Sequence, residues 1–134
     1  MPRLYREAPI NAIWEGSGNV QCLDVLRAIA RAPETLDAYF AEVETTRGAH
    51  RALDAHIAEL KEDLRDRSDF EHRARELCDR LALGLMASAM VKGAPAANAD
   101  ALCRSRLETR GQHHWGALPR GIDLAGIVKR AAPR

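Results

Sequence analysis

The residues best suited to chemistry lie near the N-terminus, in the run 13–19, Ile-Trp-Glu-Gly-Ser-Gly-Asn. Glu15 stands beside Trp14, and a carboxylate in such an apolar, partly dry setting has its pKa raised toward that of a general base at neutral pH. Gly16 and Gly18 would let a ligand approach the backbone, and the free N–H groups of a following helix would attract an anion or a polar cofactor. A plain loop with a helix N-cap fits the same residues, because no strand precedes this turn as in a dinucleotide-binding fingerprint.

A second group of chemically notable residues is basic and lies toward the C-terminus. Residues 92–134 hold eight Lys and Arg residues against three acidic ones, whereas residues 1–46 hold four against seven. The net charge of +1 for the whole chain therefore conceals a gradient. A basic end attracts polyanions, although a solvated basic surface explains the charge equally well.

The spacing of apolar residues predicts that helices position both groups. Leu53, Ile57, Leu60 and Leu64 recur at helical intervals, which predicts an amphipathic helix over about 48–66. The stripe must be covered, so this segment is expected to pack against other helices.

A further helix is predicted over about 69–91 and would be the central one. Leu77, Leu81 and Leu85 repeat every four residues, and four more residues widen the stripe: Ala74, Cys78, Met86 and Met90. Met86 and Met90 are expected to fill gaps in the core.

Four more helices complete the expected fold. Asn19 is a suitable N-cap for a helix over about 20–31, whose apolar face contains Val20, Leu23, Leu26 and Ile29. The others are expected over about 33–43, 95–109 and 123–131. Residues 1–17 show neither a helical stripe nor strand alternation, and residues 111–121 are typical of a loop. No strand signal competes, so the predicted fold class is all-α, a helical bundle.

Cysteine, histidine and hydropathy patterns argue against several classes of protein. Three widely spaced cysteines fit neither a disulfide framework nor a zinc pattern, which favours a cytoplasmic location. His113 and His114 with Cys103 and Trp115 invite a metal interpretation, but adjacent histidines cannot easily share one ion, so no metal is expected. The longest uncharged run, 81–91, is too short to span a bilayer, and the N-terminus lacks the apolar region of a secretory signal.

Three stretches of the sequence resemble one known family. Residues 3–28, RLYREAPINAIWEGSGNVQCLDVLRA, resemble the last part of the acyl-CoA dehydrogenase fold, and specifically its AidB branch, the DNA alkylation response proteins. Residues 92–107 and 118–131 resemble the C-terminal extension of that branch more loosely. The resemblance implies that residues 1–32 end the dehydrogenase helical domain and that residues 33–134 form a helical extension.

The resemblance also implies roles for the turn at residues 13–19. In acyl-CoA dehydrogenases the corresponding turn carries the catalytic base and touches FAD, so Glu15 would abstract the α-proton of an acyl-CoA thioester while a hydride passes to the flavin. The hydroxyl of Ser17 would replace that of the usual Thr, and the other residues expected at the flavin are Trp14, Gly16, Gly18 and Asn19. The Trp14 ring replaces the more usual Tyr and is expected to narrow the acyl pocket.

For the extension, the resemblance implies a DNA-binding region. Contacts to the phosphates of double-stranded DNA, without sequence readout and strongly salt-dependent, would come from basic side chains. The expected residues are Lys92, Arg104, Arg106, Arg110, Arg120, Lys129 and Arg130.

The resemblance covers only the end of the dehydrogenase fold, so we expect a fragment without independent dehydrogenase activity. Exposure of Ile10, Ile13 and Trp14 would favour aggregation or a homo-oligomer, and the family is tetrameric. Two alternatives stay open. In the first, the chain is part of an ordinary acyl-CoA dehydrogenase whose extension packs against neighbouring subunits. In the second, it is a stand-alone helical interaction module.

Overall fold

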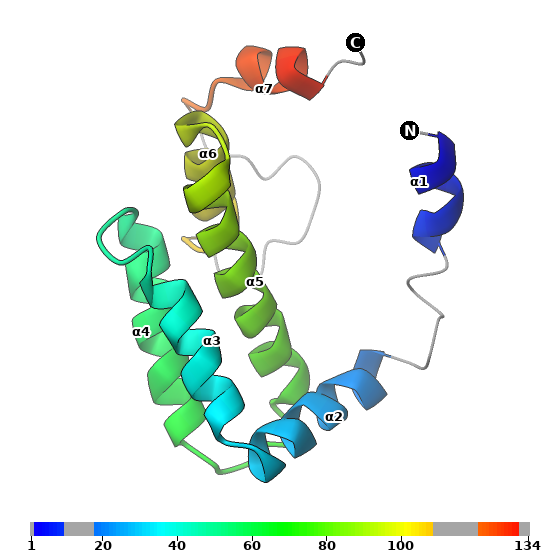
Figure 1. Cartoon of the computed structure of the whole chain (residues 1–134), viewed down its shortest axis with the longest axis vertical. Helices are drawn as coiled ribbons and strands as arrows, with labels where there is room; N and C mark the ends of the chain where they lie inside the picture. The colour runs from blue at the N-terminus through cyan, green and yellow to red at the C-terminus, as the bar shows by residue number, and fades with distance from the viewer. Residues whose placement is uncertain (1, 10–17, 109–120, 132–134) are drawn as a thin grey trace.

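The computed structural model describes residues 2–9, 18–108 and 121–131, and the regular elements in these stretches are all helical. The seven α-helices there are α1 (Pro2–Glu7), α2 (Gly18–Arg31), α3 (Glu34–Glu44), α4 (Arg51–Arg65), α5 (Ala74–Gly93), α6 (Ala96–Arg106) and α7 (Leu124–Ala131) (Figure 1). The predicted all-α bundle is confirmed for these stretches. None of the described helices is long and apolar enough to cross a membrane.

Helix α5 is the centre of the bundle, as its apolar spacing predicts. It packs against α2, α3, α4 and α6, and α2 crosses it near its first turns (Figure 1). Small residues allow this close packing: a Cβ atom on Gly84 would lie 2.6 Å from the Tyr39 hydroxyl of α3 and 3.0 Å from Cδ1 of Ile57 of α4. Three helices therefore meet at Gly84.

Two apolar clusters hold the helices together. The first contains buried residues of α3 to α6, namely Val43, Ala52, Leu53, Ile57, Ala87 and Cys103. The second joins α2 to α4 and α5 through Leu26, Leu60, Leu64, Ala74 and Leu77. The predicted stripe of α4 is confirmed, and each fully buried Leu contributes about 1.5–3 kcal/mol.

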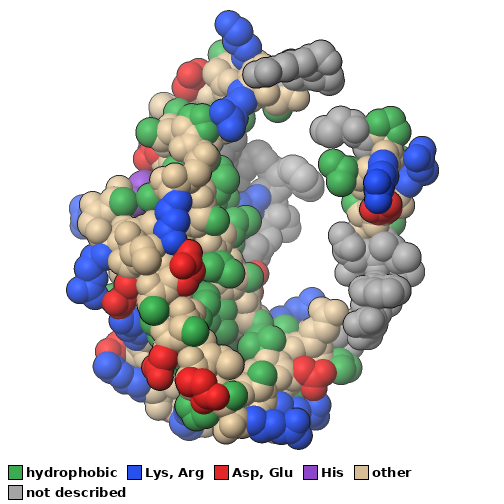
Figure 2. Space-filling model, viewed as in Figure 1, with side chains coloured by type: hydrophobic (Ala, Val, Ile, Leu, Met, Phe, Trp, Pro, Cys, Tyr) green, Lys and Arg blue, Asp and Glu red, His purple; other side chains and the backbone are tan. Residues whose placement is uncertain are grey.

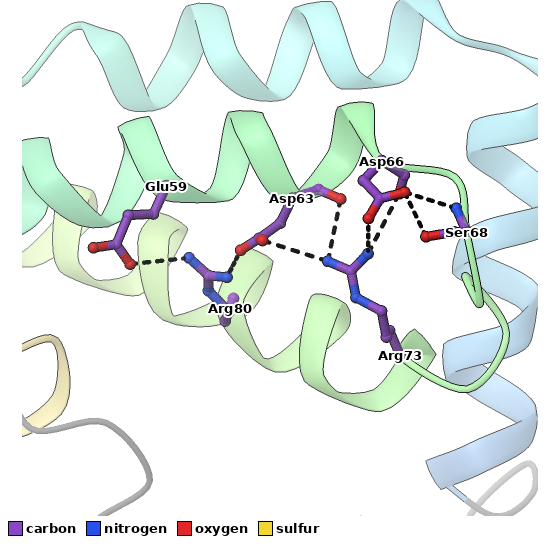
Figure 3. Close-up of polar contacts among 6 residues, drawn as sticks. All are labelled: Glu59, Asp63, Asp66, Ser68, Arg73 and Arg80. Carbon is purple, nitrogen blue, oxygen red and sulfur yellow. Dashed lines mark hydrogen bonds and ion pairs between the residues drawn. The ribbon is translucent and has the colours of Figure 1, made fainter.

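Charged side chains fasten α4 to α5 beside this core (Figure 3). Arg80, only 15% exposed, pairs with Asp63 and, at 3.6 Å, with Glu59. Arg73 lies 3.4 Å from the Asp63 carboxylate and 3.6 Å from that of Asp66. Because two arginines share Asp63, the network favours one register of α4 against α5.

The predicted start of the central helix at residue 69 is wrong. Residues 68–73 form turns, Asp69 has φ +48°, and α5 begins at Ala74. The Asp66 carboxylate accepts hydrogen bonds from the main-chain N–H of Ser68 at 2.9 Å and from its hydroxyl at 2.6 Å. Such local side-chain bonds compete with the helical ladder, which explains the later start.

Other predicted boundaries move by a few residues. Helix α4 begins at Arg51 rather than 48, because His50 caps it: Nδ1 accepts from the N–H of Ala52 at 3.2 Å, and Gly48 before it has φ +82°. Helix α6 ends at Arg106, three residues before its predicted end.

The short helix α1 was not predicted. None of its residues is buried, so it has no apolar stripe that could have revealed it. One ion pair, Arg3 Nε to Glu7 Oε1 at 3.1 Å, spans a single turn.

The expectation that Met86 fills the core is also wrong. Met86 is 44% exposed and its neighbour Leu85 is 45% exposed, while Met90 is half-buried. The packed face of α5 runs through buried Leu77, Gly84 and Ala87 instead, and neighbouring side chains fill the space beside Gly84.

Candidate functional site

The candidate turn is described only from its last two residues onward. Glu15, with Trp14, Gly16 and Ser17, lies outside the described residues. Gly18 and Asn19 are described, and they open α2. The geometry of the site is therefore the geometry of the start of α2.

The prediction that Asn19 caps a helix starting at residue 20 is wrong. Helix α2 begins at Gly18, so Asn19 lies inside its first turn. Its side-chain oxygen Oδ1 instead accepts a hydrogen bond from Nη1 of Arg75 on α5, at 2.7 Å. A partner 56 residues away takes the oxygen that a local cap would have used.

The Arg75 side chain also lies against Gly18. A Cβ atom built on Gly18 would be 3.4 Å from Nη2 of Arg75, which is ordinary van der Waals contact. The guanidinium thus adds a positive charge to the end of α2 where the free N–H groups and the helix dipole are already positive. Donors of this kind attract anionic or polar groups.

Sequence reasoning missed Arg75. No local pattern marks it, because its contact with Asn19 depends on how α5 packs against α2. The sequence shows only that Arg75 lies less than one turn before the apolar Leu77 and Cys78 on the predicted central helix. That position alone does not identify its partner.

One turn farther along the same interface, two cysteines meet. Sγ of Cys78 donates to the main-chain carbonyl of Cys22 at 3.6 Å, and both residues are half-buried. Burial, together with the neighbouring Cys22 thiol, raises the pKa of Cys78 to about 12. Leu26 and Ile29, both buried, continue the packed face of α2 as predicted, whereas Val20 is 49% exposed.

The described residues predicted to bind DNA come from three helices, α5, α6 and α7, and two of them pair with acidic side chains. Lys92 of α5 pairs with Glu42 of α3, and Arg104 of α6 lies 3.4 Å from Asp100. Arg106 ends α6, and Lys129 with Arg130 lies in the last turn of α7; Arg110 and Arg120 fall outside the described residues. On the face shown in Figure 2, basic and acidic side chains alternate rather than forming one patch.

Cys103 is a core residue in this structure. It is fully buried in the first apolar cluster, and burial with nearby acidic groups raises its pKa to about 11. His113, His114 and Trp115 lie outside the described residues, and no group of three metal-ligating side chains occurs among those described.

Comparison with known proteins identifies the relatives of the chain. It is 39% identical over 111 residues to AidB of Escherichia coli (strain K12), a protein classed by its name with the acyl-CoA dehydrogenases. This match covers 83% of the chain and 20% of AidB. A second relative, acyl-CoA dehydrogenase family member 11 of Caenorhabditis elegans, is 37% identical over 62 residues, 46% of the chain and 10% of the relative.

The chain therefore spans a fifth or less of the length of these curated relatives. No family model matches it. The identity to AidB nevertheless extends over most of the chain. This chain is a relative of the AidB-like acyl-CoA dehydrogenases.

Proposed function

We propose that this chain supplies the C-terminal helical part of an FAD-dependent, AidB-type acyl-CoA dehydrogenase acting on an acyl-CoA thioester in the cytoplasm. Residues 1–32 contribute the flavin-side turn and the helix after it, and residues 33–134 form the extension. The observation that supports this most is the contact between Arg75 of the extension and Asn19 at the start of α2. The extension thereby reaches back to the candidate site.

In this proposal Glu15 takes the α-proton of the thioester, and bound FAD supplies the hydride acceptor. A carboxylate beside an aromatic ring in a dry site would have its pKa raised toward that of a general base, which is the role proposed for Glu15 beside Trp14. Ser17 offers a hydroxyl hydrogen bond, and Gly16 and Gly18 allow close approach of the backbone.

The rest of the chain positions this turn. Buried Leu26 and Ile29 anchor α2 to the bundle, and Arg75 holds its first turn. Misplacement of a catalytic group by about 1 Å can cost on the order of 100-fold in rate, so a fixed α2 matters for proton transfer.

A chimera tests the proposed dehydrogenase role. This chain replaces the matching part of Escherichia coli AidB, and flavin content and flavin reduction by acyl-CoA are measured beside AidB itself. We expect the chimera to retain FAD, and Glu15→Gln to keep FAD but to slow flavin reduction by about 100-fold or more. A folded chimera without FAD, or unchanged reduction in Glu15→Gln, contradicts the proposal.

We further propose sequence-independent binding of double-stranded DNA at the α6–α7 end. The supporting observation is charge: α3 carries four acidic residues and no basic one, whereas α7 carries Lys129 and Arg130 and no acidic residue. Lys92 is already paired with Glu42, so it should contribute less.

A salt titration with a labelled duplex tests this second role. Binding should weaken steeply with salt, and Lys129→Ala with Arg130→Ala should weaken it further and reduce the salt slope by about 2. The matched control, Lys92→Ala, should change binding less. Absence of binding at low salt by the folded chain would remove DNA from the proposal.

Homo-oligomer formation is the last part of the proposal. Leu85 and Met86 present an apolar surface on α5 that a neighbouring subunit could cover. Sedimentation of the chain should show self-association that Leu85→Lys weakens, and a clean monomer in the unchanged chain argues against it.

A further inference from the structure

Cys22 and Cys78 are in contact where α2 crosses α5. The 3.6 Å contact between Sγ of Cys78 and the carbonyl of Cys22 places both residues at this crossing, and neither is fully buried. Helix axes in contact lie about 8–10 Å apart, which brings facing Cα atoms within the roughly 7 Å limit for a disulfide. Cys103 belongs to the other apolar cluster, on α6, and is fully buried.

We propose that Cys22 and Cys78 form a reversible disulfide when a low-molecular-weight disulfide oxidises them. The Cys22 thiolate attacks the S–S bond of the reagent, forms a mixed disulfide and releases one small thiol. The Cys78 thiolate then attacks the Cys22 sulfur, closes the Cys22–Cys78 bond and releases the second small thiol. The two protein thiols lose two protons and two electrons, and the reagent is reduced to two thiols.

The surroundings of Cys78 assign the order of attack. Burial raises the pKa of Cys78, which makes its thiolate scarce, so the proposal has Cys78 act second, on the mixed disulfide at Cys22. Once Cys22 is bonded to the reagent, its thiol no longer contributes to raising the pKa of Cys78. Burial remains, so ring closure should be faster in mildly alkaline solution.

The disulfide would link α2 covalently to α5 of the extension, one turn beyond the Arg75–Asn19 contact. It closes a loop between residues 56 apart, which restricts the unfolded chain and stabilises the folded one. That the disulfide would also fix the flavin-side turn rests on the proposed function, whereas formation of the bond does not.

The experiment treats the folded 134-residue chain with oxidised glutathione at mildly alkaline pH. Free thiols are counted, and unreduced tryptic peptides are analysed by mass spectrometry. Trypsin separates the three cysteines, because Cys22, Cys78 and Cys103 fall in the peptides 7–27, 76–80 and 93–104. We expect peptides 7–27 and 76–80 to be linked, two of the three thiols to be lost, and Tm to rise by roughly 10 °C until a reductant is added.

Single variants distinguish this pair from other disulfides. Cys103→Ser should still form the link, whereas Cys22→Ser and Cys78→Ser should lose it and stay near the reduced Tm. Three persistent thiols in the unchanged chain, a link involving Cys103, or a disulfide between two chains would each overturn the proposal. These outcomes do not depend on FAD, so they are separate from failure of the proposed dehydrogenase role.

Discussion

Helices α4, α5 and α7 all carry apolar residues at helical spacing, but only the α4–α5 pair has its apolar face covered. Leu60 of α4 and Leu77 of α5 have no exposed surface, whereas Leu124 and Val128 of α7 are 53% and 69% exposed. No residue of α7 is buried. Apolar spacing thus predicts that a helix forms, while the surroundings decide how much that helix contributes to stability.

The largest loss of stability is expected when the covered apolar face of the α4–α5 pair is disrupted. Leu60→Ala should lower the free energy of unfolding by about 2–5 kcal/mol, because it leaves a cavity at the joint of α2, α4 and α5. The matched change on the uncovered helix, Val128→Ala, should cost less than about 0.5 kcal/mol. Urea denaturation followed by circular dichroism measures both, and equal losses would refute the contrast.

The ion pairs between α4 and α5 should make the next largest contribution to the free energy of unfolding. Asp63→Asn removes the carboxylate shared by Arg73 and Arg80, and should cost about 2 kcal/mol because Arg80 is largely withdrawn from water. Glu62→Gln removes an exposed pair with Arg65 and should cost less than about 0.5 kcal/mol. If both variants denature at the same urea concentration, the Asp63 network does not fasten the helices.

Close packing at α5 predicts a smaller loss. Gly84→Ala places a methyl group 2.6 Å from the Tyr39 hydroxyl, which donates to the Leu81 carbonyl at 2.8 Å. After the gain in helix propensity, the net cost should be about 1–2 kcal/mol. Gly93→Ala, with open space around it, should be neutral or stabilising. In thermal melts Gly84→Ala should therefore lower Tm, whereas Gly93→Ala should leave Tm unchanged or raise it.

The smallest effect concerns pH. Burial lowers the pKa of His56, whose Nε2 lies 2.8 Å from the Arg80 carbonyl. The unfolded chain therefore binds a proton near pH 6.5 that the folded chain does not, so stability should fall as pH falls through about 6.5. Stability should therefore be lower at pH 5.5 than at pH 7, and His56→Gln should remove this difference. A pH dependence that survives in His56→Gln assigns it to other groups.

The sequence predicted the helices whose apolar faces are covered. The spacing of Leu53, Ile57, Leu60 and Leu64 located α4, and Leu77 with Leu81 located α5 as the central helix. Such periodicity can be read from one segment alone, because burial on one side of a helix imposes it.

Other features could not be predicted because they depend on contacts distant in sequence or on local polar bonds. The bond from Arg75 to Asn19 joins residues 56 apart, and the late start of α5 follows from hydrogen bonds of Ser68 to Asp66. In the candidate turn, the sequence indicated that Glu15 could act as a base. The role of Glu15 stays a prediction because residues 10–17 lie outside those described.

The most direct test of the account measures the affinity of the chimera for FAD with and without Arg75. If the extension holds the start of α2 at the flavin side through the bond from Arg75 to Asn19, Arg75→Ala should weaken FAD binding several-fold. Arg31→Ala, an exposed basic residue at the other end of α2, is the control. An unchanged dissociation constant for Arg75→Ala, with Arg31→Ala also unchanged, would contradict the claim that the extension positions the flavin-side turn.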